Sequence, residues 1–207
     1  MPPASIRITY QPGETAQCDL WFPEPTIPVG HGQLMLPVLV ITLGFSRFLT
    51  ATMVPSRQAG DILAGMWQLI NGLGMVPKAL VSDRESAIGG TGIVTVRAAS
   101  FAGWLSTRIQ LAPPRDSEFK GMVERNNGYF ETSFLPGRSF ASPADFNTQL
   151  DGCGEEVPRI IEEAGANFAR VIRRAPGTSY PKALQDSRRS LGDSSVKSTL
   201  PHIQKAA

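Results

Sequence analysis

The order of the strand-like and helical segments most constrains how this chain can fold. Three strand-like segments come first, at residues 15–22, 33–43 and 47–54, and the turn Gly44-Phe45-Ser46 joins the last two as a hairpin. The helical and strand-like segments that follow alternate: residues 57–72, 78–82, 97–106, 107–111 and 118 onwards. Strands in succession followed by this alternation predict an α/β protein with a mixed five-stranded sheet flanked by helices.

Start and stop residues support the helix at 57–72. Ser56 is the expected N-cap, and Gly72 and Gly74 are expected to end the helix. Its apolar stripe consists of Ile62, Met66, Leu69 and Ile70. Residues 85–95 follow the strand 78–82 as a glycine-rich surface loop, which lacks the lysine motif of a phosphate cradle.

Composition excludes several classes of protein. The 207 residues are 42% hydrophobic and 18% charged, and no run approaches the roughly 18 apolar residues of a membrane span. The two cysteines and two histidines are isolated, which argues against a zinc module or a disulfide scaffold and fits a reducing cytoplasm. Residues 1–150 contain 11 basic and 11 acidic side chains, so a partner or a further segment must supply much of any DNA affinity.

Two acids lie where strands are predicted. Asp19 is in the middle of the first strand, where an ionised carboxylate needs a partner unless the strand is an edge strand that turns the acid to solvent. Asp83 directly follows the strand 78–82. If these two strands are neighbours, their acids are neighbours too.

A third acid comes from the last helix of this region. The helix follows Pro113-Pro114, with Asp116 and Ser117 as N-cap candidates. Its apolar stripe consists of Phe119, Met122, Val123, Phe130 and Phe134, and Glu124 lies about 140° from Phe119 around the axis. Glu124 is either an ordinary surface acid or an acid that points into a cleft.

Clustered carboxylates indicate a metal site. Three of them repel one another unless a cation neutralises them, and hard oxygen ligands select Mg²⁺ or Mn²⁺. Two such ions about 4 Å apart promote phosphodiester chemistry. Asp116 and Glu118 are rival third acids, and Glu118 lies about 240° from Glu124, so both cannot face one metal.

Three motifs in order resemble a known family. QCDLWF with Asp19, ALVSDRESA with Asp83, and KGMVERNNGYFE with Glu124 resemble the catalytic core of retroviral integrases and bacterial DDE transposases. Forty residues separate Asp83 from Glu124, near the spacing typical of that group. The segments YQPGETAQCDLW and PADFN are most similar to the IstA-type transposases of insertion sequences, and the resemblance covers about residues 8–150.

The resemblance implies a fold, a site and a reaction. The fold is ribonuclease H-like, and the acid after G-x-V selects Glu124 as the third member beside Asp19 and Asp83. These residues are then both catalytic and metal-binding, with two Mg²⁺ or Mn²⁺ ions per site. The implied reaction is DNA transposition by phosphodiester hydrolysis and strand transfer. The weaker candidates for contact with DNA are Arg115, Lys120, Arg125 and Asn127.

The resemblance also implies partners and a location. The DNA partners are transposon ends and target DNA, and the protein partners are further copies of the chain and an ATPase helper protein. The expected location is the bacterial cytoplasm, on the nucleoid when DNA is bound, with no membrane association.

The chain departs from the family at its ends. We expect a lead-in at 1–14, the catalytic core at 15–135, and an atypical C-terminal extension at 136–207. Only about 15 residues precede the first strand, where the family carries helix-turn-helix segments, so a truncated copy is expected. Two other functions remain open: an inactive interaction protein that modulates full-length transposase, and a ribonuclease H-like nuclease.

The C-terminal extension is predicted in three parts. A short helix is expected within residues 139–150, with its entry at Ser142-Pro143. A second helix is expected over 155–174. Residues 175–207 are rich in Ser, Pro and Gly and are expected to be loose, because they cannot bury enough apolar surface to offset the entropy of ordering.

Limited proteolysis tests this division of the chain. Cleavage should begin within residues 175–207 and leave a resistant fragment near residues 8–150, and removal of 175–207 should leave Tm nearly unchanged. Mass spectrometry of the fragments identifies the cut sites. A resistant unit that extends to the C-terminus would contradict the prediction.

Overall fold

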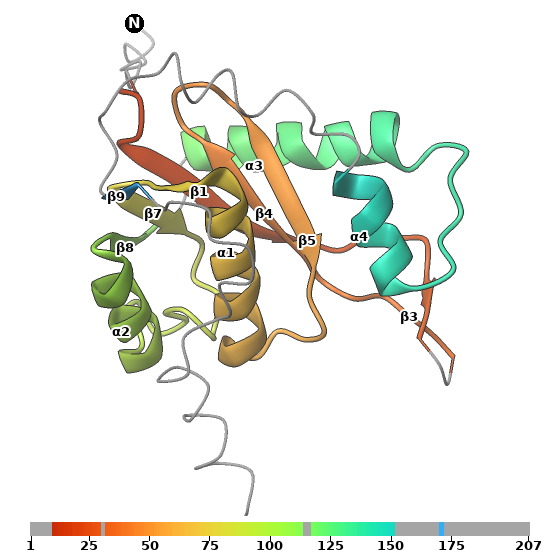
Figure 1. The fold of residues 1–207 in the computed structure, drawn as a ribbon, viewed down its shortest axis with the longest axis horizontal. Coiled ribbons are helices and arrows are strands. Elements are labelled where there is room, and N and C mark those ends of the chain that lie inside the picture. Colours follow the sequence, from red (N-terminus) through yellow and green to blue (C-terminus); the bar gives the residue numbers. More distant parts are fainter. Residues whose placement is uncertain (1–9, 30–31, 114–116, 152–169, 172–207) are drawn as a thin grey trace, which may run out of the picture.

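A five-stranded mixed sheet forms the centre of the protein (Figure 1). The computed structural model describes residues 10–29, 32–113, 117–151 and 170–171. The strands lie in the order β5-β4-β1-β7-β8. Their bounds are β1 Thr15–Trp21, β4 Val38–Leu43, β5 Leu49–Met53, β7 Ala79–Ser82 and β8 Arg108–Leu111. β1 pairs antiparallel with β4 and parallel with β7, and β8 pairs parallel with β7, so the predicted mixed sheet is confirmed.

A two-stranded arm corrects the predicted strand at 33–43. β3, Gln33–Leu34, pairs with β2, Ile27–Pro28, which lies between the first two predicted strands. The chain then leaves regular structure for three residues before β4 begins at Val38. Pro37 precedes that start, and proline cannot donate a backbone hydrogen bond to a ladder, which explains the break.

Helices α1, Ala59–Leu73, and α2, Val96–Leu105, cover one face of the sheet (Figure 1). The predicted stripe of α1 is buried in full and packs with Ala16, Leu39 and Leu80 of the strands. Gly65 allows the close approach, because a Cβ there would lie 2.7 Å from Val54 Cγ1. The apolar stripe of α1 therefore positions it on the sheet, as the sequence indicates.

The ends of α1 differ in part from the prediction. Gly74 ends the helix with φ 72°, and its N–H donates to the Asn71 carbonyl, while Gly72 lies within the helix. Ser56 is not the N-cap, a position that Gln58 takes. The Ser56 hydroxyl instead accepts from the Gln58 N–H at 3.1 Å and donates to Asp61 Oδ2 at 2.5 Å, so it organises the turn before the helix.

The opposite face carries α3, Ser117–Tyr129, a π-helical turn η1, Phe130–Phe134, and α4, Pro143–Asp151. Phe130 and Phe134 are fully buried, as the stripe predicts, whereas the side chains of Phe119, Met122 and Val123 lie outside the described residues. Phe130 stacks on Trp21 of β1 with ring centres 4.6 Å apart. This aromatic contact joins the end of α3 to the central strand.

Two asparagines connect this helical layer to the sheet. Asn126 Nδ2 donates to Thr42 Oγ1 at 2.8 Å, which ties α3 to β4. Asn147 of α4 accepts from the Met53 N–H at 2.7 Å and donates to the Met53 carbonyl at 3.3 Å. The Asn147 amide thus pairs with the backbone of the edge strand β5. α4 begins at Pro143 after Ser142, whose Oγ accepts from the Asp145 N–H, so the predicted helix start is confirmed.

The loop at 85–95 contributes to the core. Ile88 is fully buried and packs with the α1 side of the sheet, so the expectation of a purely surface loop is wrong there. The Thr95 N–H donates to the Ile88 carbonyl at 2.8 Å, and Thr95 Oγ1 accepts from Ala98 N as the N-cap of α2. The apolar Ile88 gains more from burial than from exposure, and the glycines around it allow the tight turns.

A short strand corrects the helix predicted over 155–174. β9, Arg170–Val171, pairs antiparallel with β6, Met75–Val76. The extended backbone of β6 offers hydrogen-bonding groups that a helix could not pair with, so these two residues are extended. The remainder of the predicted helix and residues 175–207 lie outside the described residues. Within the described ranges, no helix is both long and apolar enough to cross a membrane.

Phe130→Ala should destabilise the fold strongly. The substitution removes a fully buried ring that contacts Trp21 and Phe134, and such a cavity costs about 3–5 kcal/mol. Urea unfolding followed by tryptophan fluorescence measures the loss. Glu131→Ala, an exposed neighbour, serves as the control and should change stability by less than about 0.5 kcal/mol. A similar small loss for both variants would contradict the role of the stack.

Candidate active site

Asp19 and Asp83 come together because their strands are paired. β1 and β7 are adjacent and parallel, with Cys18 opposite Ser82 in the register. Asp19 is the next residue of β1, and Asp83 directly follows the last residue of β7, so the two acids lie next to each other just past the paired register. The first predicted strand and the strand 78–82 are therefore neighbours, as the predicted meeting of the two acids requires.

The pleat of β1 turns Asp19 toward the α3 side. Cys18 and Leu20 pack with the core under α1 and α2, whereas Trp21 packs with η1 and α4. Because side chains alternate along a strand, Asp19 shares its face with Trp21. β1 is the central strand, so the alternative that Asp19 sits on a solvent-facing edge strand is wrong.

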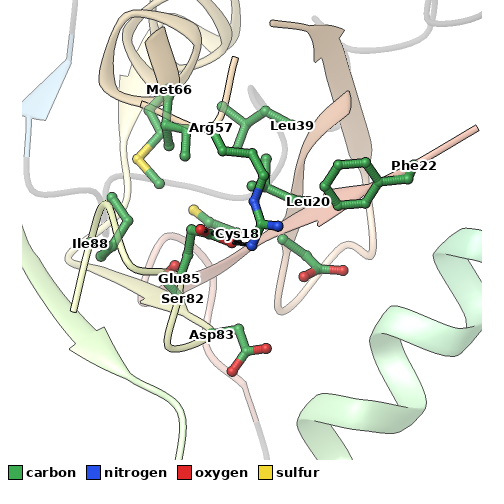
Figure 2. Close-up of a pocket in the computed structure, with 12 residues that line it drawn as sticks. Cys18, Leu20, Phe22, Leu39, Arg57, Met66, Ser82, Asp83, Glu85 and Ile88 are labelled. Atoms are coloured by element: carbon green, nitrogen blue, oxygen red, sulfur yellow. Dashed lines mark hydrogen bonds and ion pairs between the residues drawn. The ribbon is translucent and has the colours of Figure 1, made fainter. Parts of the chain in front are cut away.

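A cleft of about 220 Å³ includes both acids (Figure 2). Leu39, Met66 and Ile88 form apolar parts of its lining. Its polar lining consists of Asp19, Asp83, Glu85, Arg57 and Ser82. The cleft lies where β1 and β7 approach their carboxyl ends, the edge at which open α/β sheets place functional groups.

Asp19 is a buried carboxylate with other acids nearby. The pKa of Asp19 is raised to about 6. Burial is the largest cause, a backbone hydrogen bond from Leu20 lowers the pKa, and the negative charges of Asp83 and Glu85 raise it by smaller amounts. The chain therefore holds Asp19 where its ionised form is disfavoured. A cation placed between these acids would offset the free-energy cost of the buried negative charge.

Cys18 also lines the cleft but is not a reactive thiol. Burial raises the pKa of Cys18 to about 12, and the charge of Asp19 raises it as well. The thiol is therefore neutral at physiological pH and packs as a small apolar group.

Glu85 and Arg57 are cleft residues that the sequence analysis did not single out. Arg57 Nη2 bonds both carboxylate oxygens of Glu85, at 2.8 and 3.0 Å. Figure 2 shows the Glu85 carboxylate turned to this guanidinium, while Asp83 lies apart from the pair. The signal in the sequence is the position of Glu85, two residues after Asp83, but nothing local indicates a partner 28 residues earlier.

Glu124 lies on α3, apart from the cleft lining. Its side chain is exposed, and α3 contacts β1, the strand that carries Asp19. Within the described part of the chain, no three Asp, Glu, His or Cys side chains are grouped closely enough to hold a metal ion. The structure thus brings Asp19 and Asp83 together, and their convergence with Glu124 stays a prediction. The rivals Asp116 and Glu118 have no described side chains.

The residues expected to contact DNA are described in part. Arg125 is exposed on α3. Asn127 is half-buried, and its Oδ1 is buried without a hydrogen-bond partner among the described residues. Arg115 and the side chain of Lys120 lie outside the described residues.

Comparison of the sequence finds a related transposase. The chain is 25% identical over 187 residues to a Geobacillus stearothermophilus protein named as a transposase for insertion sequence element IS5376. The match covers 88% of this chain but only 46% of the relative, so the chain spans about half the length of that protein. No family model matches the sequence.

Comparison of the structure finds integrase folds. A chain of the simian T-cell lymphotropic virus intasome, in complex with PP2A regulatory subunit B56 gamma, matches with TM-score 0.57 and 18% identity over 87% of this chain and 65% of that one. The catalytic core domain of BIV integrase matches with TM-score 0.50 and 15% identity over 86% of this chain and 97% of that one.

These matches confirm the expected fold. The chain has the ribonuclease H-like mixed sheet of integrase catalytic cores, and it resembles DDE transposase and integrase cores as its three motifs indicate. At these identities the structural matches bear on the fold alone.

Asp19→Asn should make the metal-free protein more stable at neutral pH. The raised pKa means that the folded state binds the Asp19 proton more tightly than the unfolded state, so the wild type loses stability as pH rises from about 4 to 6. The variant lacks this titration and should be about 2 kcal/mol more stable than the wild type at pH 7, with a small difference at pH 4.

Urea unfolding in EDTA across this pH range measures the effect. Glu131→Gln, an exposed acid on η1, is the control and should track the wild type at every pH. A stability difference between Asp19→Asn and the wild type that does not change with pH would contradict the prediction.

Proposed function

We propose that the chain catalyses DNA strand transfer in transposition, by metal-dependent phosphodiester hydrolysis followed by joining. The observation that carries the proposal is the pair of carboxylates, Asp19 and Asp83, just past the paired register of two adjacent parallel strands. The sequence relative named as a transposase supports the choice of DNA as substrate.

The donor set fits a hard divalent cation. Asp19 and Asp83 supply carboxylate oxygens, which Mg²⁺ and Mn²⁺ prefer, and the raised pKa of Asp19 records an unfavourable charge that a cation offsets. In this proposal Asp19 and Asp83 hold the metal, and Glu124 completes the ligands from α3. Two bound ions would activate the attacking oxygen and stabilise the leaving oxygen.

The chain's own residues orient the reaction. The pairing of β1 with β7 fixes the two aspartates relative to each other, and the stack of Phe130 on Trp21 fixes the end of α3 relative to β1. In hydrolysis, a water oxygen bonds to phosphorus as the P–O bond to the 3′ oxygen breaks. In joining, the freed 3′ hydroxyl attacks a phosphodiester of the target strand and displaces its 3′ oxygen.

Other partners belong to the proposal as well. The residues of 1–150 are electrically neutral, so recognition of transposon ends requires added positive surface from other copies of the chain or from further segments. We therefore propose a homo-oligomer on DNA, with an ATPase helper protein as a further partner.

Asp83→Asn should abolish strand transfer. The variant weakens the metal site, and a loss of about 100-fold or more is expected for one missing electrostatic group at the reacting phosphate. The assay follows hydrolysis and joining of terminal-repeat DNA in Mg²⁺, with Glu131→Gln as the control that keeps the wild-type rate. Equal product from wild type and Asp83→Asn would exclude the proposed role of Asp83. An absence of product from both proteins would favour the inactive interaction protein.

Mg²⁺ should also raise Tm of the wild type, because it binds only the folded site. The Asp83→Asn variant should show a smaller rise, measured by differential scanning fluorimetry over a Mg²⁺ titration. If the two proteins shift equally, the metal binds elsewhere.

A further inference from the structure

Arg57 occupies a special position at the cleft. It precedes α1, and it is the cation among the described residues that line the cleft. Its guanidinium carbon lies 5.5 Å from the centre of the Phe22 ring, and its Nη2 bonds the Glu85 carboxylate at 2.8 and 3.0 Å (Figure 2). The ring and the carboxylate together restrict the orientation of the guanidinium.

Most of the donors of Arg57 remain available. A guanidinium carries five N–H groups, two of them on Nη2, so three belong to Nη1 and Nε. Both hydrogen bonds to Glu85 use Nη2, and within the described residues Nη1 and Nε have no hydrogen-bond partner. The Arg57 side chain is 58% exposed, whereas that of Glu85 is 14% exposed, so the remaining donors can reach a ligand from solvent.

The charges in the cleft require such a donor. Asp19, Asp83 and Glu85 are all acidic, and a backbone phosphate that approaches them is repelled unless positive groups accompany it. In the proposed function a metal ion would offset the two aspartates, and the Arg57 guanidinium already pairs with Glu85. An arginine fork matches the oxygens of a phosphate, and its donors lie at the same cleft as the proposed reaction.

We propose that Arg57 binds a backbone phosphate of the DNA substrate and positions the strand at the cleft, with Glu85 and Phe22 holding its guanidinium in place. This inference rests on the proposed function and adds to it a specific DNA contact. Arg57 takes no part in bond making or breaking in this account. Glu85 acts on the DNA only through Arg57.

Binding of a fluorescein-labelled duplex of mixed sequence tests the proposal. Fluorescence anisotropy is measured on the full chain over a range of salt concentrations, with Ca²⁺ in the buffer. Arg57→Gln should weaken binding about five-fold and reduce the slope of log Kd against log salt by about 1, as expected for one lost phosphate contact. Arg57→Lys keeps the charge and should keep the slope, with weaker binding because the fork is lost.

Two further variants separate phosphate binding from a structural clamp. Glu85→Gln removes a negative charge from the cleft but keeps a side-chain oxygen that can accept from Arg57 Nη2, so the variant should bind DNA at least as tightly as the wild type. A structural clamp predicts equal losses for Glu85→Gln and Arg57→Gln. Arg47→Gln is the matched control, because Arg47 also lies over an aromatic ring, that of Tyr10, but in the β4–β5 hairpin next to the amino end of β1. It should keep the wild-type affinity.

The outcomes distinguish this inference from the function on which it rests. If the wild type binds and joins DNA while Arg57→Gln and Arg57→Lys keep both its affinity and its salt slope, the role of Arg57 is overturned and the proposed function stands. Equal losses for Arg57→Gln and Glu85→Gln also overturn it. If the wild type binds no duplex at any salt concentration, the role of Arg57 is overturned, whereas strand transfer of terminal-repeat DNA decides the proposed function. Thermal melts confirm that each variant is folded.

Discussion

The parallel pairing of β1 with β7 is the constraint on which the site depends. It places Cys18 opposite Ser82, and it therefore sets Asp19 and Asp83 next to each other, although 63 intervening residues separate them in the chain. Backbone hydrogen bonds hold this register, so the carboxylates meet despite their mutual repulsion. Burial is the main cause of the raised pKa of Asp19, and the nearby charges of Asp83 and Glu85 add to it, so the fold holds this carboxylate where its ionised form is disfavoured.

The helical layer behind the acids depends on packing more than on helix propensity. The stack of Phe130 on Trp21 and the hydrogen bond from Asn126 to Thr42 attach the α3 segment to the sheet. Trp21 lies two residues beyond Asp19 on the same face of β1. One strand therefore carries both the proposed metal ligand Asp19 and the ring that packs against the end of α3, the helix that bears Glu124. Weakening the stack of Phe130 on Trp21 would therefore loosen the position of Glu124 relative to the two aspartates.

Much of the fold follows from local sequence patterns, but the surroundings of the acids do not. The alternation of strand and helix predicts the sheet, and the stripe of Ile62, Met66 and Ile70 predicts the buried face of α1. The ion pair of Arg57 with Glu85 could not be predicted, because it joins a turn and a loop that only the tertiary structure brings together. The pairing of β9 with β6 escaped prediction for the same reason, since two residues carry no periodicity.

The most direct measurement of the central claim is anomalous diffraction from crystals of the full chain soaked in Mn²⁺. The account predicts a manganese peak between the carboxylates of Asp19 and Asp83, with Glu124 of α3 as a further ligand, and its loss in Asp83→Asn crystals. Manganese bound only at other sites, at a concentration that saturates them, would contradict the claim that these two aspartates form the metal site.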